Sequence, residues 1–299
     1  MLKAINLSNQ KHLGFLCATI SYTIWGFSFI IVRIALNSAS PEVLLATRFF
    51  IAFLMLNFLL LTGKAKISLR GKKIGGLILL GLIDPVLCFS FEVYGIFYTN
   101  ATLAGAMMAL NTIVSLALAA LILKEKPNNR QKIFVWLPVT GVMIITASTY
   151  ANFAIRLFGV ALLIAASFCE NFARIINRKI SPVFTAFERT YTMILLGFTV
   201  FATAAVIKNF GNIGFIVQSL CKPSFLVSAL ILGVFCSFGA FLCMNFAATQ
   251  LTVTQISVFP SLSTVIAIAT GTLILNEPFA MLSVIGAMLI VTGIFNVAR

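Results

Sequence analysis

Charged side chains are scarce in this chain. They make up 9% of its 299 residues, whereas a soluble domain has about a quarter. Only 7 residues are acidic, while 61% are hydrophobic and the mean hydropathy is +1.08. A chain with so few polar groups cannot form a surface for water, so it needs the lipid bilayer as its solvent. This composition excludes a soluble domain.

The groups on which most enzymes depend are also missing. The single histidine, His12, precedes the first apolar run, and the chain has no GxSxG, HExxH, CxxC or Walker A motif. Five of the six cysteines lie inside apolar runs, where cysteine behaves as a small hydrophobic residue. We therefore expect no enzyme activity, no cofactor and no metal site.

Ten apolar runs are long enough to cross the hydrocarbon core, which takes about 20 helical residues. An even number of spans places both termini on one side, and most of the 21 basic residues fall in the loops and ends of that side. Such clusters between spans mark cytoplasmic loops rather than a nucleic-acid surface. We predict an all-α protein of the inner (cytoplasmic) cell membrane, with both termini cytoplasmic and with spans at 13–33, 43–62, 74–98, 100–123, 133–150, 157–176, 183–207, 224–247, 250–275 and 279–297.

The two halves of the chain repeat one pattern. SPEVLLATR (40–48) corresponds to SPVFTAFER (181–189), and ILKEKP (122–127) to ILNEP (274–278). We predict two five-helix domains, residues 1–151 and 152–299. Because each domain has an odd number of spans, the second lies inverted in the membrane relative to the first. Inverted repeats place a binding site near the midplane and work by rocking. This arrangement indicates a secondary transporter.

A known family shares these motifs. Trp25-Gly26 in the first span, Ser-Pro…Arg at spans two and seven, and Glu125 and Glu277 closing spans four and nine resemble EamA-type members of the drug/metabolite transporter superfamily. The resemblance implies a ten-helix exporter or exchanger of small metabolites. It also implies a central cavity between helices one, three, four, six, eight and nine.

Two acidic residues lie in the third predicted span. Asp84 stands at its middle, directly before Pro85, and a proline break is tolerated where it faces protein or a water-filled cavity. Asp84 is therefore a candidate cavity residue, the alternative being a protonated side chain bonded to a neighbouring helix. Glu92 lies about 80° around a regular helix from Asp84, and is either a cavity residue or part of a salt bridge at the outer rim.

The sixth span contains Glu170, Asn171 and Arg174. Glu170 and Arg174 are four residues apart and can form a structural ion pair. Alternatively, Glu170 and Asn171 face the cavity opposite Trp25, the counterpart of Glu170 in the first half.

Three further candidates are uncharged, namely Asn111, Asn245 and Gln255 on spans four, eight and nine. Their alternative role is hydrogen bonding between helices. Arg48, Glu188 and Arg189 stand near span ends, and we expect them to be structural and to snorkel to the membrane surface.

The candidate cavity has more acids than bases, which favours a substrate with an amino or other cationic group. We expect a secondary transporter of a small metabolite, an amino acid or related amine, working as a monomer or homodimer. Proton coupling is open, because a carboxylate in a partly dry site binds protons more tightly. The alternatives are efflux of cationic drugs, uptake of a nucleoside or sugar, and a channel.

Overall fold

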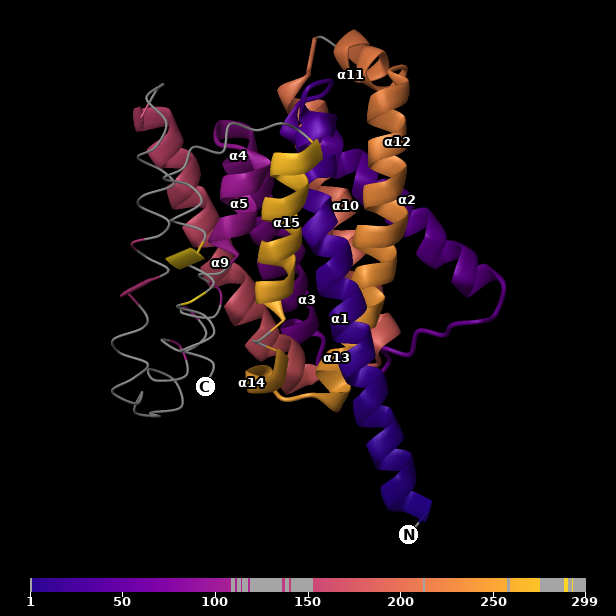
Figure 1. Cartoon of the computed structure of the whole chain (residues 1–299). Coiled ribbons are helices and arrows are strands. Elements are labelled where there is room, and N and C mark those ends of the chain that lie inside the picture. Colours follow the sequence, from indigo (N-terminus) through magenta and orange to yellow (C-terminus); the bar gives the residue numbers. More distant parts are fainter. Residues whose placement is uncertain are drawn as a thin grey trace.

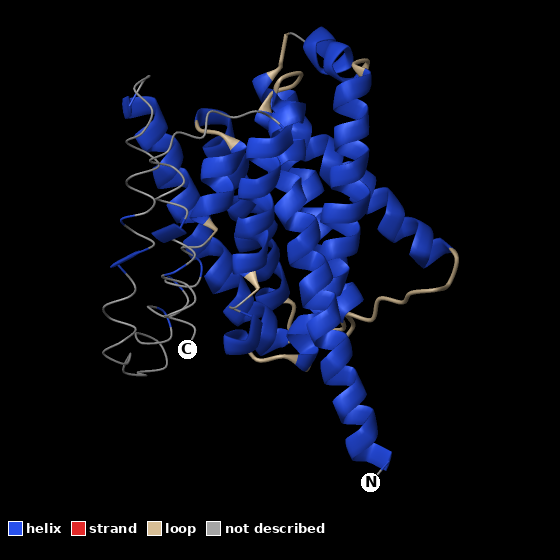
Figure 2. Cartoon of the chain, viewed as in Figure 1, coloured by secondary structure: helices blue, strands red, loops and turns tan. Residues whose placement is uncertain are grey.

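The computed structural model describes residues 2–108, 153–211, 213–256 and 259–274, with scattered residues in 111–140 and 288–292. Within these ranges the chain is helical and forms no strand (Figure 2). Half of the predicted span 100–123, and all but scattered residues of the predicted spans 133–150 and 279–297, lie outside the described residues.

Six described segments are long and apolar enough to cross a membrane. They match predicted spans one to three and six to eight, which confirms an all-helical membrane protein. Ten spans and cytoplasmic termini stay predictions. The segments are α1 (Leu2–Leu36), α2 (Pro41–Leu61), α3–η1–α4 (Gly75–Gly81, Leu82–Leu87, Cys88–Tyr98), α9 (Phe153–Ile180), α10 (Ala186–Lys208) and α12–η2–α13 (Pro223–Ile231, Leu232–Ala240, Phe241–Gln250).

Local sequence signals set several helix starts. Pro41 and Pro223 open α2 and α12, where a missing N–H costs nothing. Thr185 and Glu188 form a capping box at the start of α10, in which each side chain binds the other residue's backbone N–H. These signals fix where the three helices begin.

The third and eighth spans each contain a π-helical segment, η1 and η2 respectively. In η1 the backbone of Asp84 departs from helical geometry, with φ −135° and ψ 111°. Pro85 follows it and has no N–H for the helical ladder. η1 and η2 thus interrupt the third predicted span of each half, and the repeat itself stays a prediction.

The ninth span differs from its predicted range of 250–275. α13 ends at Gln250, Leu251 is extended, and a one-turn helix α14 (Val253–Ile256) precedes α15 (Pro260–Ile274). A second capping box explains the separation. The Thr252 backbone N–H donates to Gln255 Oε1 at 3.0 Å, and the Gln255 N–H donates to Thr252 Oγ1 at 3.3 Å.

The helices lie side by side in one bundle, with the N-terminal part of α1 projecting below it (Figure 1). α2 packs extensively on α10, α4 on α9, and α1 on α13 and α15. An ion pair between Glu42 and Lys208 also joins α2 to α10, and Lys72, in the loop after α2, pairs with Glu188 at the start of α10. α11 (Ile213–Leu220) lies in the predicted loop 208–223, and α5 (Ala101–Met107) is the described start of the fourth span.

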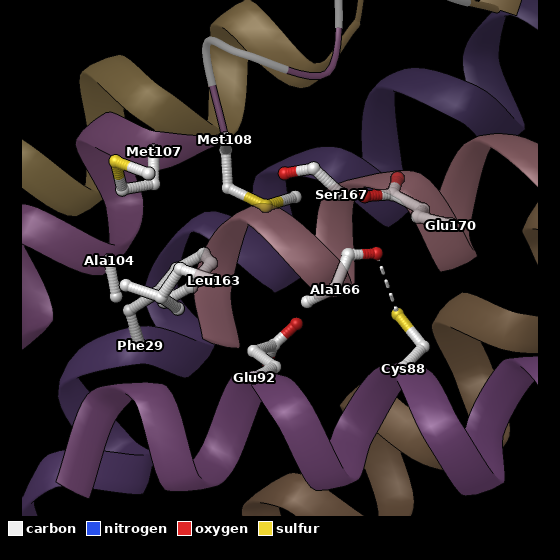
Figure 3. Close-up of a pocket in the computed structure, with 10 residues that line it drawn as sticks. All are labelled: Phe29, Cys88, Glu92, Ala104, Met107, Met108, Leu163, Ala166, Ser167 and Glu170. Carbon is white, nitrogen blue, oxygen red and sulfur yellow. Dashed lines mark hydrogen bonds between the residues drawn. The ribbon is translucent and has the colours of Figure 1, made fainter. Parts of the chain in front are cut away.

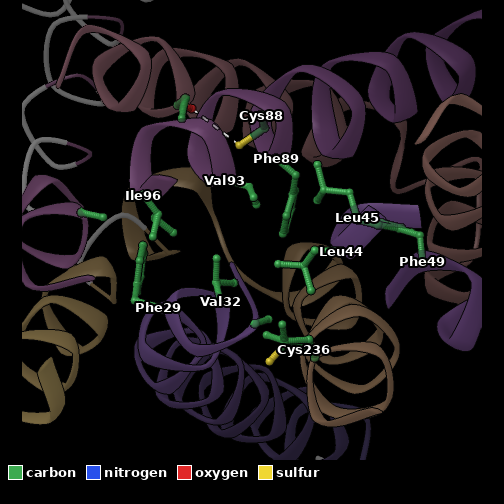
Figure 4. Close-up of a cluster of buried hydrophobic side chains, with 14 of the residues drawn as sticks. Phe29, Val32, Leu44, Leu45, Phe49, Cys88, Phe89, Val93, Ile96 and Cys236 are labelled. Atoms are coloured by element: carbon green, nitrogen blue, oxygen red, sulfur yellow. Dashed lines mark hydrogen bonds between the residues drawn. The ribbon is translucent and has the colours of Figure 1, made fainter. Parts of the chain in front are cut away.

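Buried apolar side chains from α1, α2, α4 and η2 meet in the core (Figure 4). Phe29 and Val32 come from α1, Leu44 and Phe49 from α2, and Phe89 from α4. Close helix contact depends on small residues elsewhere. A Cβ on Gly105 of α5 would lie 2.1 Å from Ala267 Cβ of α15. The packing around the core therefore holds α1, α4 and α5 at fixed positions beside the cavity described next.

Candidate functional site

A cavity lies among α1, η1, α4, α9 and α13. A second, smaller pocket adjoins it and shares Phe29, Cys88, Glu92, Met108 and Glu170. Both halves of the chain contribute to the wall. The larger cavity is lined by Trp25, Ser28, Phe29, Asp84, Cys88, Phe89, Glu92, Met108, Glu170 and Phe241.

Three carboxylates from three helical elements reach this cavity. Asp84 comes from η1, Glu92 from α4 and Glu170 from α9. On a regular α-helix Asp84 and Glu92 would point about 80° apart. That angle does not apply here, because the helix is broken at Asp84, whose backbone is not helical, and Glu92 lies on the helix that follows the kink. The irregular segment thus brings both acids to one wall.

Glu170 is held by three partners on three helices. Its Oε1 accepts from Arg174 Nη2 at 2.5 Å and from the Tyr22 hydroxyl at 3.3 Å, while its Oε2 accepts from Asn111 Nδ2 at 2.5 Å. The side chain of Glu170 is 18% exposed, and that of Arg174 is 4% exposed. The predicted ion pair therefore exists, and the same carboxylate also lines the cavity.

Arg174 and Asn171 complete this network behind the wall. Arg174 Nη2 also donates to the Tyr22 hydroxyl at 2.9 Å, and Nη1 donates to Asn171 Oδ1 at 3.1 Å. Asn171 in turn donates to Asn111 Oδ1 at 3.2 Å. Every polar group of this cluster is therefore satisfied within the protein.

The other two acids have much weaker protein support. Oδ1 of Asp84 is buried without a hydrogen-bond partner in the described part of the chain. The described residues give the Glu92 carboxylate no hydrogen bond either, and Figure 3 shows it pointing from α4 into the pocket toward α9. Cys88, one turn earlier, donates to the Ala166 carbonyl at 3.6 Å. Buried polar groups without partners are rare in proteins, so these acids are available to a ligand.

Aromatic side chains form the opposite part of the wall. The Trp25 and Phe241 rings meet edge to face at 5.8 Å, and Phe241 and Phe89 are 5.6 Å apart. Trp25 also contacts Tyr22 at 5.1 Å. The cavity thus combines carboxylates with aromatic faces, and both attract cations.

The predicted site residues fall into three groups. Trp25, Asp84, Glu92 and Glu170 line the cavity, and Asn111 and Asn171 support Glu170 from behind it. Asn245 and Gln255 lie elsewhere. Asn245 bonds to Thr190 and Asn177 in a buried network, and Gln255 caps α14 from an exposed position. Their assignment to the substrate is not supported by this placement.

The expected snorkelling of Arg48, Glu188 and Arg189 is wrong. Their exposed fractions are 1%, 2% and 0%. Arg189 is held by the Asn177 side chain and the Asn245 carbonyl, and Glu188 by Lys72 at 2.9 Å. Helix packing encloses Arg48 and Arg189, whereas Ser68 and Lys72 of the loop after α2 cover Glu188.

Sequence reasoning missed six lining residues, namely Ser28, Phe29, Cys88, Phe89, Met108 and Phe241. A helical spacing signal was present for some of them. Residues 25, 28 and 29 share one face of α1, as residues separated by three or four positions do. Cys88 stands midway between Asp84 and Glu92. Nothing in the sequence marked Phe241 among 29 phenylalanines.

Comparison with known proteins agrees with this architecture. The model of the EamA-like transporter family matches residues 12–147 and again 157–299. A relative from Bacillus subtilis (strain 168), named uncharacterized transporter YcxC, is 31% identical over 291 residues, which cover 96% of this chain and 93% of the relative. A probable amino-acid metabolite efflux pump of Salmonella typhimurium is 26% identical over 168 residues, 56% of this chain and 54% of that protein.

One crystal structure shares the fold across the whole chain. Its TM-score is 0.64 at 13% identity, and the match covers 97% of this chain and 96% of the other. The helical spans and the family match over nearly the full length lead to one conclusion. This chain belongs to the EamA-like transporter family.

Proposed function

We propose that the protein is a secondary transporter that exports or exchanges a small metabolite carrying an amino group, an amino acid or related amine. The observation that carries this proposal is the charge in the cavity wall. Glu170 is neutralised by Arg174, whereas Asp84 and Glu92 have no hydrogen-bonded cation among the described residues. Leaving carboxylates unpaired inside a membrane protein is costly. A protonated amine would remove that cost.

The apolar part of the wall supports an organic substrate rather than a metal ion. Trp25, Phe29, Phe89, Met108 and Phe241 surround the acids. They offer a surface for a hydrocarbon side chain, and a transported inorganic cation would need several oxygen ligands instead. The relative named a probable amino-acid metabolite efflux pump is consistent with this class of substrate.

Alternating access is the mechanism that fits the fold. The cavity wall combines α1 and α4 of the first half with α9 and α13 of the second. Irregular segments interrupt the third and eighth spans at matching places. Rocking of inverted repeats about such a central site exposes it to each side in turn.

Transport by purified protein in liposomes tests the proposal. Counterflow of a labelled amino acid or amine should be observed, and Asp84→Asn should lower its rate tenfold or more. Glu42→Gln is the matched control, because Glu42 pairs with Lys208 at the end of α2, away from the cavity. Equal rates in Asp84→Asn and wild type would remove Asp84 from the site. Flux without counterflow would indicate a channel.

A second substrate class is favoured by the aromatic wall. Aromatic faces bind lipophilic cations, so efflux of cationic drugs is the competing function. It predicts that tetraphenylphosphonium, which has no amino group, competes with the amine for transport. A lack of competition by this cation would exclude the alternative.

A further inference from the structure

Arg48 is a buried cation with unused hydrogen-bond donors. It lies on α2 and is 1% exposed, and its Nε donates to Ser237 Oγ on η2 at 2.9 Å. Its Nη1 and Nη2 atoms are buried, and no hydrogen-bond partner for them stands in the described part of the chain. A buried guanidinium normally needs a carboxylate and full hydrogen bonding to offset the loss of water. Arg48 therefore has capacity for an anionic partner.

The corresponding arginine of the second half has no such capacity. Arg189 occupies the same place in the Ser-Pro…Arg motif and is also fully buried. Its Nη1 donates to the Asn177 side chain and to the Asn177 carbonyl at 3.3 Å, and its Nη2 donates to the Asn245 carbonyl at 2.6 Å. Protein acceptors thus satisfy both Nη groups.

The repeat also explains why the two arginines differ. Residues 14–34 correspond to 159–179, which pairs Asn177 with Val32. Val32 is fully buried and has no side-chain acceptor. The first half therefore has no side-chain acceptor for Arg48 at the repeat position where the second half has Asn177.

Arg48 is close to the cavity. Its guanidinium carbon lies 4.7 Å from the centre of the Phe89 ring, and Phe89 is part of the cavity wall. Glu92 and Asp84 line the same cavity as Phe89. One aromatic ring thus contacts both the cavity and an unsatisfied cation, beside two acids that lack hydrogen bonds from described residues.

We propose that Arg48 binds the carboxylate of the transported molecule when the Phe89 side chain moves aside, while Glu92 and Asp84 bind its amino group. The substrate is then a zwitterionic amino acid and not a simple amine. A guanidinium binds a carboxylate through two parallel hydrogen bonds, for which Nη1 and Nη2 are free. This inference rests on the proposed function and specifies its substrate.

The test compares the standard L-amino acids with their α-amides, which keep the amino group and lose the carboxylate charge. Binding to the purified full-length protein is measured by calorimetry at about pH 6.5, where the amino groups stay protonated. We expect at least one amino acid to bind tenfold or more tightly than its amide, a difference of about 1.4 kcal/mol. Arg48→Gln should reduce this ratio to near one.

A second variant tests the same idea without changing Arg48. Val32→Asn supplies the acceptor that Asn177 gives Arg189, so it should lower the acid-to-amide ratio several-fold. Val32→Ala is the matched control, because it changes the same site without adding an acceptor, and it should keep the wild-type ratio. Val32→Asn also keeps the test valid should Arg48→Gln fail to fold.

Four results would overturn the inference. A ratio near one in the wild type, or a ratio that both Arg48→Gln and Val32→Asn leave unchanged, would make Arg48 a structural residue. Tight binding of amides or amines alone would refute the carboxylate site and leave the proposed function standing. Failure of every amino acid, amide and amine to bind would refute both.

Discussion

The Glu170–Arg174 pair gives the sharpest stability prediction. Glu170→Gln removes the negative charge but keeps the shape of the side chain, so Arg174 loses its counter-ion. Arg174→Leu leaves the carboxylate with Asn111 and Tyr22 as donors. The double variant removes both charges together.

The expected magnitudes follow from burial. Arg174 is 4% exposed, so it cannot recover its interaction with water. Removing one member of a buried ion pair costs about 3–5 kcal/mol, whereas replacing both by neutral groups is often neutral or stabilising. The loss of stability in Glu170→Gln should lie near the lower end of this range, because the glutamine oxygen can still accept a hydrogen bond from Arg174. Arg174→Leu should cost less, since Glu170 reaches the cavity and keeps two hydrogen bonds.

The assay is equilibrium unfolding of purified protein in mixed detergent micelles, with all four proteins of the double-mutant cycle. We expect the double variant to be within about 1 kcal/mol of wild type, so the coupling energy should be close to the sum of the two single losses, at least about 3 kcal/mol. Single variants that each lose less than 1 kcal/mol and add without coupling would refute the reasoning. Substrate binding by the double variant separates the two roles of Glu170. If the double variant binds substrate with wild-type affinity, Glu170 has a structural role only.

Two further predictions concern topology and packing. In intact cells, an impermeant maleimide should modify the exposed native Cys221. It should not modify a cysteine introduced at position 68 in a Cys221→Ser background. The opposite labelling pattern would show that the orientation is reversed. Gly105→Ala should destabilise the protein by about 1–3 kcal/mol, because its Cβ would lie 2.1 Å from Ala267. Gly75→Ala, whose Cβ meets no atom within 4 Å, is the control, and equal stability of the two variants would contradict the close contact.

Helix existence followed from hydropathy alone, because a membrane span must be apolar along its whole length. The six long segments from Gln10 to Gln250 were all predicted from this signal. Boundaries required a different signal. The predicted ninth span, 250–275, is divided into α14 and α15, and Thr252 and Gln255, spaced as in a capping box, indicate where α14 begins. The same spacing explains why Gln255 lies outside the cavity.

The candidate site could be predicted only in part. Ionisable residues inside a span are costly and therefore conspicuous, so Asp84, Glu92 and Glu170 were visible in the sequence. Their partners were not, because Tyr22 and Asn111 reach Glu170 from segments 148 and 59 residues away. The relation of Asp84 to Glu92 also depends on the helix break at Asp84. Pro85 marks the place of this break in the sequence, but hydrophobic periodicity does not predict how the direction of the helix changes there.

The two halves treat their buried charges differently, and this asymmetry bears on function. In the second half Arg174 is paired with Glu170, and Arg189 is bonded to Asn177 and Asn245. In the first half the Nη groups of Arg48 and Oδ1 of Asp84 have no partners in the described chain. If both halves served only as scaffold, the repeat would have kept both sets of acceptors. We therefore expect neutral substitutions of Arg48 and Asp84 to change ligand affinity more than stability. Neutral substitutions of Arg174 and Arg189 should change stability more than ligand affinity.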